Sequence, residues 1–122
     1  MQTGRRGEEA ACEYLRRLGH TIVERNWRSG HLEVDIITLA ADGLHFVEVK
    51  TRIAPFAAAP EESVTATKQR KIVNAARRYL HSDEKKHIYC DAELFFDVIS
   101  VIFAGEDVEV QYFPQAYIPI YT

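Results

Sequence analysis

The chain has 122 residues, of which 47% are hydrophobic and 27% are charged, and its formal net charge is −3. This length and composition are typical of one folded domain, predicted here to span residues 1–122, and they exclude an intrinsically disordered chain. The first residues lack the apolar segment of a secretory signal, and no apolar run reaches the roughly 18 residues of a membrane span. A cytoplasmic protein with no membrane partner is therefore predicted.

A first helix is predicted over residues 4–18, because apolar residues recur there at helical spacing. Its inward stripe comprises Ala11, Tyr14, Leu15 and Leu18. Gly19 is well placed to end the helix. Glu8 falls on the edge of the stripe, so of the acidic residues of this helix it is the one that can face the interior.

Three strands are predicted next, over residues 21–27, 33–40 and 44–51, because these segments are rich in β-branched and other apolar residues. The pair Asp42-Gly43 is a strong signal for a two-residue hairpin between the second and third strands. With that turn, Ala41 pairs with Leu44, and counting back along both strands sets Asp35 opposite Lys50 and diagonal to Glu48. Such neighbours lie roughly 5 to 8 Å apart between Cβ atoms.

The far end of this hairpin is predicted to be ionic on one face. Because side chains alternate faces, Glu33, Asp35, Glu48 and Lys50 share one side of the sheet. Carboxylates held this close repel one another unless something compensates their charge, and Mg²⁺ or Mn²⁺ is the natural compensator because hard cations bind carboxylate and carbonyl oxygens. The alternative is that this end of the hairpin is simply solvated.

The second half of the chain is predicted to add a helix over residues 64–81, capped by Ser63 or Thr65, and strands over 94–103 and 108–113. The element order α-β-β-β-α-β-β predicts an α/β fold with a central sheet flanked by helices. Residues 53–63, with two prolines, are predicted to form a loop positioned to gate the site beyond Lys50. The tail 114–122 carries enough apolar surface to pack on the body or on a second copy.

The cysteines and histidines do not show the spacing of a zinc site. Cys12 and Cys90 are interpreted as reduced, small hydrophobic residues, and the five histidines as surface or turn residues. The arginine pairs Arg16-Arg17 and Arg77-Arg78 are interpreted as solvated helix faces.

Several motifs together resemble a known family. They are Gly4-x-x-Gly7-Glu8, Arg25-Asn26-Trp27-Arg28, Glu33-Val34-Asp35, the run from Phe46 to Arg52, Lys68-Gln69 and Phe96-Asp97-Val98-Ile99. In these motifs the chain resembles the YraN-like predicted endonucleases, which are similar to archaeal Holliday-junction resolvases and belong to the PD-(D/E)xK nuclease group. The resemblance implies a restriction-endonuclease-like fold with a mixed central sheet.

The resemblance also implies a function and a site. Asp35 and Glu48 would bind Mg²⁺ or Mn²⁺ together with the main-chain carbonyl of Val49, Lys50 would assist the attacking water, and Glu8 would complete the acidic cluster directly or through water. The role of Glu33 stays open. The residues that would contact phosphates are Arg28, Arg52, Lys68 and Gln69. The expected activity is endonucleolytic cleavage of DNA, with branched or junction DNA as candidate substrates, by a homodimer or a monomer.

Two other readings stay open. The acidic net charge is compatible with a non-catalytic nucleic-acid-binding or interaction module that retains the nuclease fold, because phosphate binding usually depends on a basic surface. In a weaker reading, the acids and the lysine form a buried structural ion network.

Overall fold

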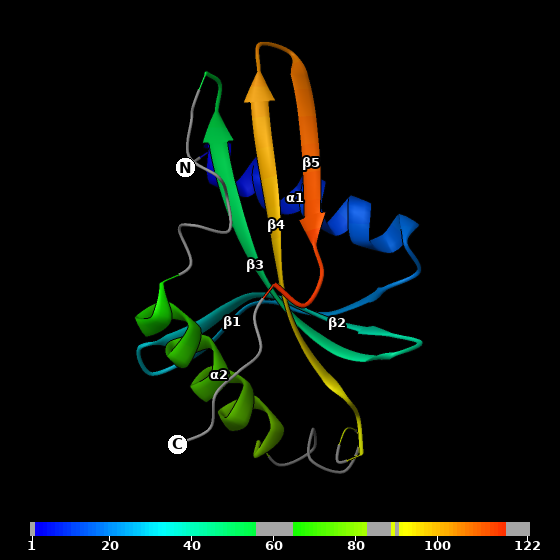
Figure 1. Cartoon of the computed structure of the whole chain (residues 1–122), viewed down its shortest axis with the longest axis vertical. Coiled ribbons are helices and arrows are strands. Elements are labelled where there is room, and N and C mark those ends of the chain that lie inside the picture. The colour runs from blue at the N-terminus through cyan, green and yellow to red at the C-terminus, as the bar shows by residue number, and fades with distance from the viewer. Residues whose placement is uncertain (1, 56–64, 83–88, 90, 117–122) are drawn as a thin grey trace.

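The computed structural model describes residues 2–55, 65–82, 89 and 91–116. Its elements are α1 (Gln2–Arg17), β1 (Thr21–Ser29), β2 (Leu32–Ala40), β3 (Gly43–Ile53), α2 (Ala66–Leu80), β4 (Leu94–Ala104) and β5 (Asp107–Phe113) (Figure 1). The predicted order α-β-β-β-α-β-β is confirmed. Cys90, residues 56–63 of the predicted loop and residues 117–122 of the tail lie outside the described residues.

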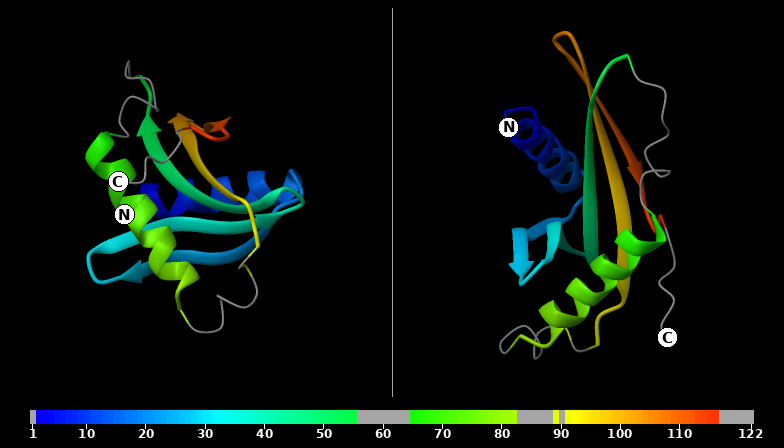
Figure 2. Two further views of the ribbon diagram at one scale, coloured as in Figure 1. Left: turned by 60° about the horizontal axis from the view of Figure 1, so that its bottom comes forward. Right: turned by 90° about the vertical axis from the view of Figure 1, so that its left-hand side faces the viewer.

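The five strands form one mixed sheet in the order β1-β2-β3-β4-β5. Neighbouring strands are antiparallel except β3 and β4, which run parallel. The segment between β3 and β4 contains α2. Two views show α1 on one face of the twisted sheet and α2 on the other (Figures 1 and 2). The sheet therefore separates two cores.

The two cores explain why the strand sequences are apolar on both faces. On the α2 side, Phe46 stacks on Phe96 with ring centroids 5.6 Å apart, and Tyr79 meets Phe46 edge-on. On the α1 side, Leu15 packs with Val47 and other fully buried residues. Burying a side chain of this size stabilises a fold by about 1.5–3 kcal/mol, so β3 and β4 are fixed from both sides.

The helix ends follow local sequence. The Thr65 side chain accepts a hydrogen bond from the backbone N–H of Lys68, which makes Thr65 the N-cap of α2. Gly19 has φ +99°, a conformation that glycine adopts without steric cost, and it follows the end of α1. The predicted place of Leu18 in the inward stripe was wrong. The helix ends at Arg17, and the Leu18 side chain is 51% exposed.

The predicted register of the hairpin was wrong by two residues. Ala40 pairs with Gly43, so the two loop residues are Ala41 and Asp42, and Gly43 begins β3. Gly43 has φ +148°, and a Cβ there would overlap the backbone oxygen of Glu93, whose carbonyl accepts a hydrogen bond from Leu44. The glycine is thus needed for close approach at the start of β3. A shift of two keeps the side chains of the paired residues on their predicted faces.

His45 is not a surface or turn residue, as the sequence had suggested. Its side chain is 3% exposed, and its two ring nitrogens lie 2.6 Å from Asp97 Oδ2 and 2.8 Å from Asp42 Oδ1. Asp97 is fully buried and also accepts hydrogen bonds from the Tyr112 hydroxyl and the Gln115 backbone. His45 and Asp97 can be buried because their polar atoms are hydrogen-bonded to one another and to neighbouring groups.

Two smaller findings concern the cysteines and membranes. Cys12 is a buried free thiol, as predicted. Within the described part of the chain, neither helix is long and apolar enough to cross a membrane.

Candidate functional site

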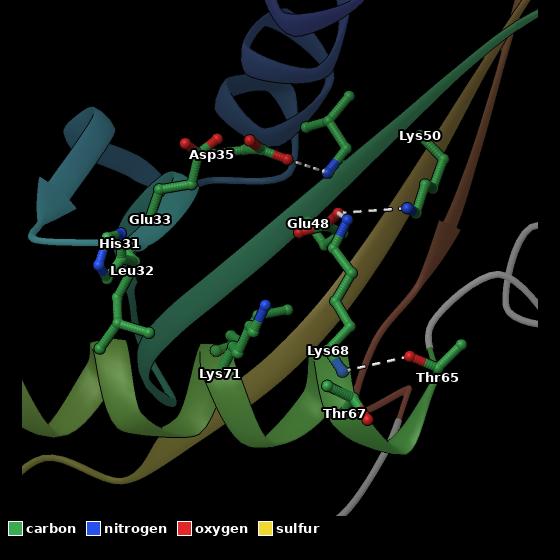
Figure 3. Close-up of a pocket in the computed structure, with 12 residues that line it drawn as sticks. His31, Leu32, Glu33, Asp35, Glu48, Lys50, Thr65, Thr67, Lys68 and Lys71 are labelled. Atoms are coloured by element: carbon green, nitrogen blue, oxygen red, sulfur yellow. Dashed lines mark hydrogen bonds and ion pairs between the residues drawn. The ribbon is translucent and has the colours of Figure 1, made fainter.

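A cavity of about 570 Å³ lies between the sheet and the first turns of α2 (Figure 3). The start of β2 contributes Leu32, Glu33 and Asp35, and β3 contributes Glu48, Val49 and Lys50. The helix α2 contributes Thr67, Lys68 and Lys71, and the β1–β2 turn contributes His31. We call this cavity the acid pocket. It brings together three of the four predicted catalytic residues and all three predicted metal-binding residues.

Asp35 lies where β2 diverges from β3. Paired residues run from Ala40↔Gly43 to Ile36↔Val47, and the next polar contact is made by a side chain: Asp35 Oδ2 accepts a hydrogen bond of 2.8 Å from the Val49 backbone N–H. Strand alternation also breaks at this point, because Val34 packs in the α2-side core and Ile36 in the α1-side core. The local twist therefore holds the Asp35 carboxylate against β3.

The Asp35 carboxylate is electrostatically unfavourable in its charged form. Burial raises its pKa to about 7, and the neighbouring negative charge of Glu48 adds to that effect, while the hydrogen bond from Val49 opposes it. More distant contributions in the same direction come from Glu8 and Glu33. A bound cation would relieve the cost of placing the charged Asp35 carboxylate beside a second carboxylate.

Glu48 is 8% exposed and is paired with two lysines. Its Oε2 lies 2.7 Å from Lys68 Nζ and 3.4 Å from Lys50 Nζ (Figure 3). Burial and the adjacent ammonium of Lys68 lower the pKa of Lys50. For Lys68, burial works against the charged form, but the ion pair with Glu48 outweighs it and raises the pKa. Of these two lysines, Lys50 is therefore the one that loses its proton more readily.

Glu8 and Glu33 occupy different surroundings. Glu33 lines the acid pocket, is half exposed and pairs with Arg28 at 3.4 Å. Glu8 is not among the described residues that line the pocket. Its Oε1 accepts a hydrogen bond of 3.0 Å from the Asn26 side chain, and Asn26 is held at φ +53°. The negative charge of Glu8 contributes to the raised pKa of Asp35. The predicted part of Glu8 in the acidic cluster stays a prediction.

Of the four residues predicted to contact phosphates, two lie in or beside the acid pocket and two lie outside its lining. Lys68 lies in the acid pocket and Arg28 beside it, through its pairing with Glu33. Arg52 and Gln69 are half-buried residues outside the described lining of the pocket. The Arg52 Nε is buried without a hydrogen-bond partner within the described residues.

The donor set of the acid pocket fits a hard divalent cation. Asp35 and Glu48 supply carboxylate oxygens, and the Val49 backbone, next to Glu48 on β3, contacts Asp35. Only one oxygen of Asp35 is engaged by a described hydrogen-bond donor. In the described residues no group of three or more His, Cys, Asp or Glu side chains is close enough to hold a metal. Any cation would therefore complete its coordination shell with water or substrate oxygen, as Mg²⁺ commonly does.

The predicted site residues did not include the pocket residues of the β1–β2 turn or, apart from Lys68, those of α2. His31 lines the pocket although its spacing matches no metal motif. Thr67 and Lys71 are four residues apart and lie on one face of the helix, a signal that helical periodicity could have provided.

Comparisons with known proteins agree on one family. Residues 7–101 match the model of the uncharacterised protein family UPF0102. A UPF0102 protein of Chlorobium chlorochromatii is 44% identical over 100 residues, which cover 82% of this chain and 74% of the relative. A UPF0102 protein of Bacteroides thetaiotaomicron is 37% identical over 118 residues, covering 97% of this chain and 93% of the relative. A UPF0102 protein of Porphyromonas gingivalis is 42% identical over 103 residues, covering 84% and 73%.

Proposed function

This chain belongs to the uncharacterised protein family UPF0102, and from its acid pocket we propose that it is a metal-dependent endonuclease that hydrolyses phosphodiester bonds in DNA, branched or junction DNA included. The observation that carries the proposal is the meeting of Asp35 and Glu48, from two neighbouring strands, with Lys50 in one open pocket. The resemblance to the PD-(D/E)xK nucleases, and with it a restriction-endonuclease-like fold, supports the same conclusion.

Phosphodiester hydrolysis needs an activated water, a neutralised phosphate and a protonated leaving oxygen. A Mg²⁺ or Mn²⁺ ion held by Asp35, Glu48 and the Val49 carbonyl would supply a Lewis acid that polarises water and phosphate oxygen. The protein supplies the remaining groups. Because its pKa is lowered, Lys50 can be neutral and take a proton from the attacking water. The ammonium formed in this way places positive charge beside the scissile phosphate and can pass the proton to the leaving oxygen.

Lys68 has a separate role in this proposal. Its 2.7 Å contact with Glu48 holds that carboxylate in place in the pocket. When a cation occupies the carboxylates, this lysine is free to turn toward a substrate phosphate, since its side chain is 42% exposed. It would then contribute to binding more than to the chemical step.

The alternative is a non-catalytic nucleic-acid-binding or interaction module. One observation favours it: Glu48 is satisfied by Lys50 and Lys68 without any cation. The two proposals differ in one respect that can be measured, since the module binds nucleic acid and leaves its phosphodiester bonds intact.

The direct test is incubation of the full chain with branched, flap and linear DNA at low salt, with Mg²⁺ or Mn²⁺ and, in parallel, with a chelator. The endonuclease proposal expects cutting only with the cation. Binding without any cutting would overturn it in favour of the module. If the protein neither binds nor cuts DNA, both proposals fail and the structural ion network remains.

Two matched substitutions separate chemistry from binding. Lys50→Met should lower kcat by about 100-fold or more, the usual effect of removing a charge that stabilises the transition state. Lys71→Met makes the same change in a residue that lines the pocket from the exposed face of α2. It should raise KM and leave kcat nearly unchanged. Equal effects of the two variants on kcat would contradict the role given to Lys50.

A further inference from the structure

A second cavity, of about 490 Å³, lies beside the acid pocket, between the β1–β2 turn and the later turns of α2. Its lining consists of Gly30, His31, Leu32, Asn74, Arg77 and Arg78. Two arginines, an amide and an imidazole are donors that suit phosphate oxygens, and the described lining contains no carboxylate. The composition of this cavity therefore favours an anionic ligand.

The second cavity adjoins the acid pocket. His31 and Leu32 line both cavities, and the two share α2 as a wall. In Figure 3 these two residues lie at the edge of the acid pocket, on the side of the β1–β2 turn. A chain-like ligand whose phosphate sits at Asp35 and Glu48 can thus continue along α2 into the second cavity.

The charge of α2 differs from that of the chain as a whole. The helix contains five cationic residues and no acidic residue, whereas the whole chain carries a formal charge of −3. Lys71, Asn74 and Arg78 are exposed and recur at intervals of three and four residues, so they lie along one face of the helix. Positive charge is thus concentrated on the element that joins the two cavities.

Arg78 is oriented by the turn that it faces. Its Nη1 donates a hydrogen bond of 3.4 Å to the Ser29 hydroxyl, and a Cβ added at Gly30 would lie 3.5 Å from the same nitrogen. Gly30 has φ +63°, which lets the β1–β2 turn close tightly under the arginine. A guanidinium held in place in this way loses less side-chain entropy on binding an anion than a freely moving one.

The length of the cationic face indicates what kind of anion fits. From Lys68 to Arg78 the helix advances about 15 Å at about 1.5 Å per residue. Each strand of a duplex presents one phosphate per about 3.4 Å of helix axis, so this distance spans roughly four phosphates. A single phosphate or nucleotide would leave most of the face unused.

We infer that α2 and the β1–β2 turn form a track for the sugar-phosphate backbone of a nucleic acid, with Arg77, Arg78, Asn74 and His31 holding phosphates that flank the bond at the acid pocket. The inference rests on the proposed function and extends it, because it assigns the path of the bound strand. It also separates Arg77 and Arg78 from Arg16 and Arg17, which the sequence treated alike.

The chain offers a matched control. Arg77 and Arg78 are the basic residues of the last turn of α2, and Arg16 and Arg17 are those of the last turn of α1. Arg77→Gln with Arg78→Gln, and Arg16→Gln with Arg17→Gln, therefore remove the same charge and the same favourable interaction with a helix C-terminus. Melting temperatures of the two double variants show whether the fold is equally intact.

The experiment measures DNA binding by fluorescence anisotropy with a chelator present, over a series of salt concentrations. The α2 double variant should bind at least about tenfold more weakly, and its plot of log K against log salt should be shallower by about 1.8, or about 0.9 for each lost phosphate contact. The α1 double variant should stay within about twofold of the unchanged protein. Equal weakening by both pairs, or no weakening by either, would overturn the inference.

A second variant guards against a folding defect. Asn74→Glu places a carboxylate in the second cavity at an exposed helical position that tolerates glutamate. It should weaken DNA binding as the α2 arginine variant does, and unchanged affinity would count against the track. If the unchanged protein fails to bind DNA, the proposed function itself fails. If it binds and cuts but the α2 variants match the α1 variant, only the track fails.

Discussion

Replacing Asp35 by asparagine should stabilise the metal-free protein at neutral and alkaline pH. Asparagine keeps a side-chain oxygen that can accept the hydrogen bond from the Val49 N–H, and it removes the negative charge that burial and Glu48 disfavour. The substitution is close to isosteric, so packing should change little. The electrostatic effect is therefore isolated from the structural one.

The magnitude follows from the pKa of the Asp35 carboxyl, which burial and Glu48 raise from 3.8 to about 7. At about 1.36 kcal/mol per pH unit, this elevation corresponds to at most about 4 kcal/mol. Between pH 3.8 and about 7 the unfolded chain releases this proton while the folded protein retains it, so the stability of the unchanged protein falls as pH rises through that window and then levels off. The advantage of Asp35→Asn should appear over the same window.

The assay is denaturant unfolding in the presence of a chelator across that pH range. Glu33→Gln is the matched control, because Glu33 lines the same pocket but is half exposed and paired with Arg28. Its effect should stay within about 0.5 kcal/mol at every pH. Lower stability of Asp35→Asn at about pH 8 would refute the reasoning and would favour a structural ion network in which the carboxylate is a stabilising partner.

Addition of Mg²⁺ should narrow the difference in stability between the two proteins. A ligand that binds only the folded state at about 100 times its Kd stabilises it by about 2.7 kcal/mol. The unchanged protein should gain stability of this order, and Asp35→Asn, which lacks one carboxylate of the donor set, should gain much less. A melting temperature that responds to Mg²⁺ equally in both proteins would place the cation elsewhere.

Two further predictions concern the frame around the site. A Cβ at Gly7 would overlap the Thr51 side chain, so Gly7→Ala should lower the free energy of unfolding, measured with denaturant, by about 1–3 kcal/mol. Adding Thr51→Ala should restore part of that loss. Simple additivity of the two changes would contradict the clash. Burial opposes protonation of His45, but its hydrogen bonds to Asp97 and Asp42 outweigh this effect and raise its pKa. The stability that protonated His45 contributes is therefore complete below pH 6.5 and is lost as pH rises through the raised pKa. His45→Gln should therefore destabilise the protein most on the acidic side, and a pH profile parallel to that of the unchanged protein would count against it.

The sequence by itself determined the elements and their order. Periodicity and turn residues indicated both helices and all five strands, and the cap at Thr65 and the end of α1 near Gly19 follow from local chemistry. The side-chain faces were also determined where β2 pairs with β3, because the period of two survives a register error of two residues. For this reason Asp35, Glu48 and Lys50 were predicted to share a face, and they line one pocket.

Only the tertiary structure decided what lies around those residues. The parallel pairing of β3 with β4 brings Asp97 to His45 across 52 positions of sequence, which turned an apparent surface histidine into a buried one. The packing of α2 set Lys68 against Glu48, and the β1–β2 turn against Arg78. The physical reason is that periodicity reports which face of its own element a residue occupies, whereas the partner it meets depends on how separate elements pack.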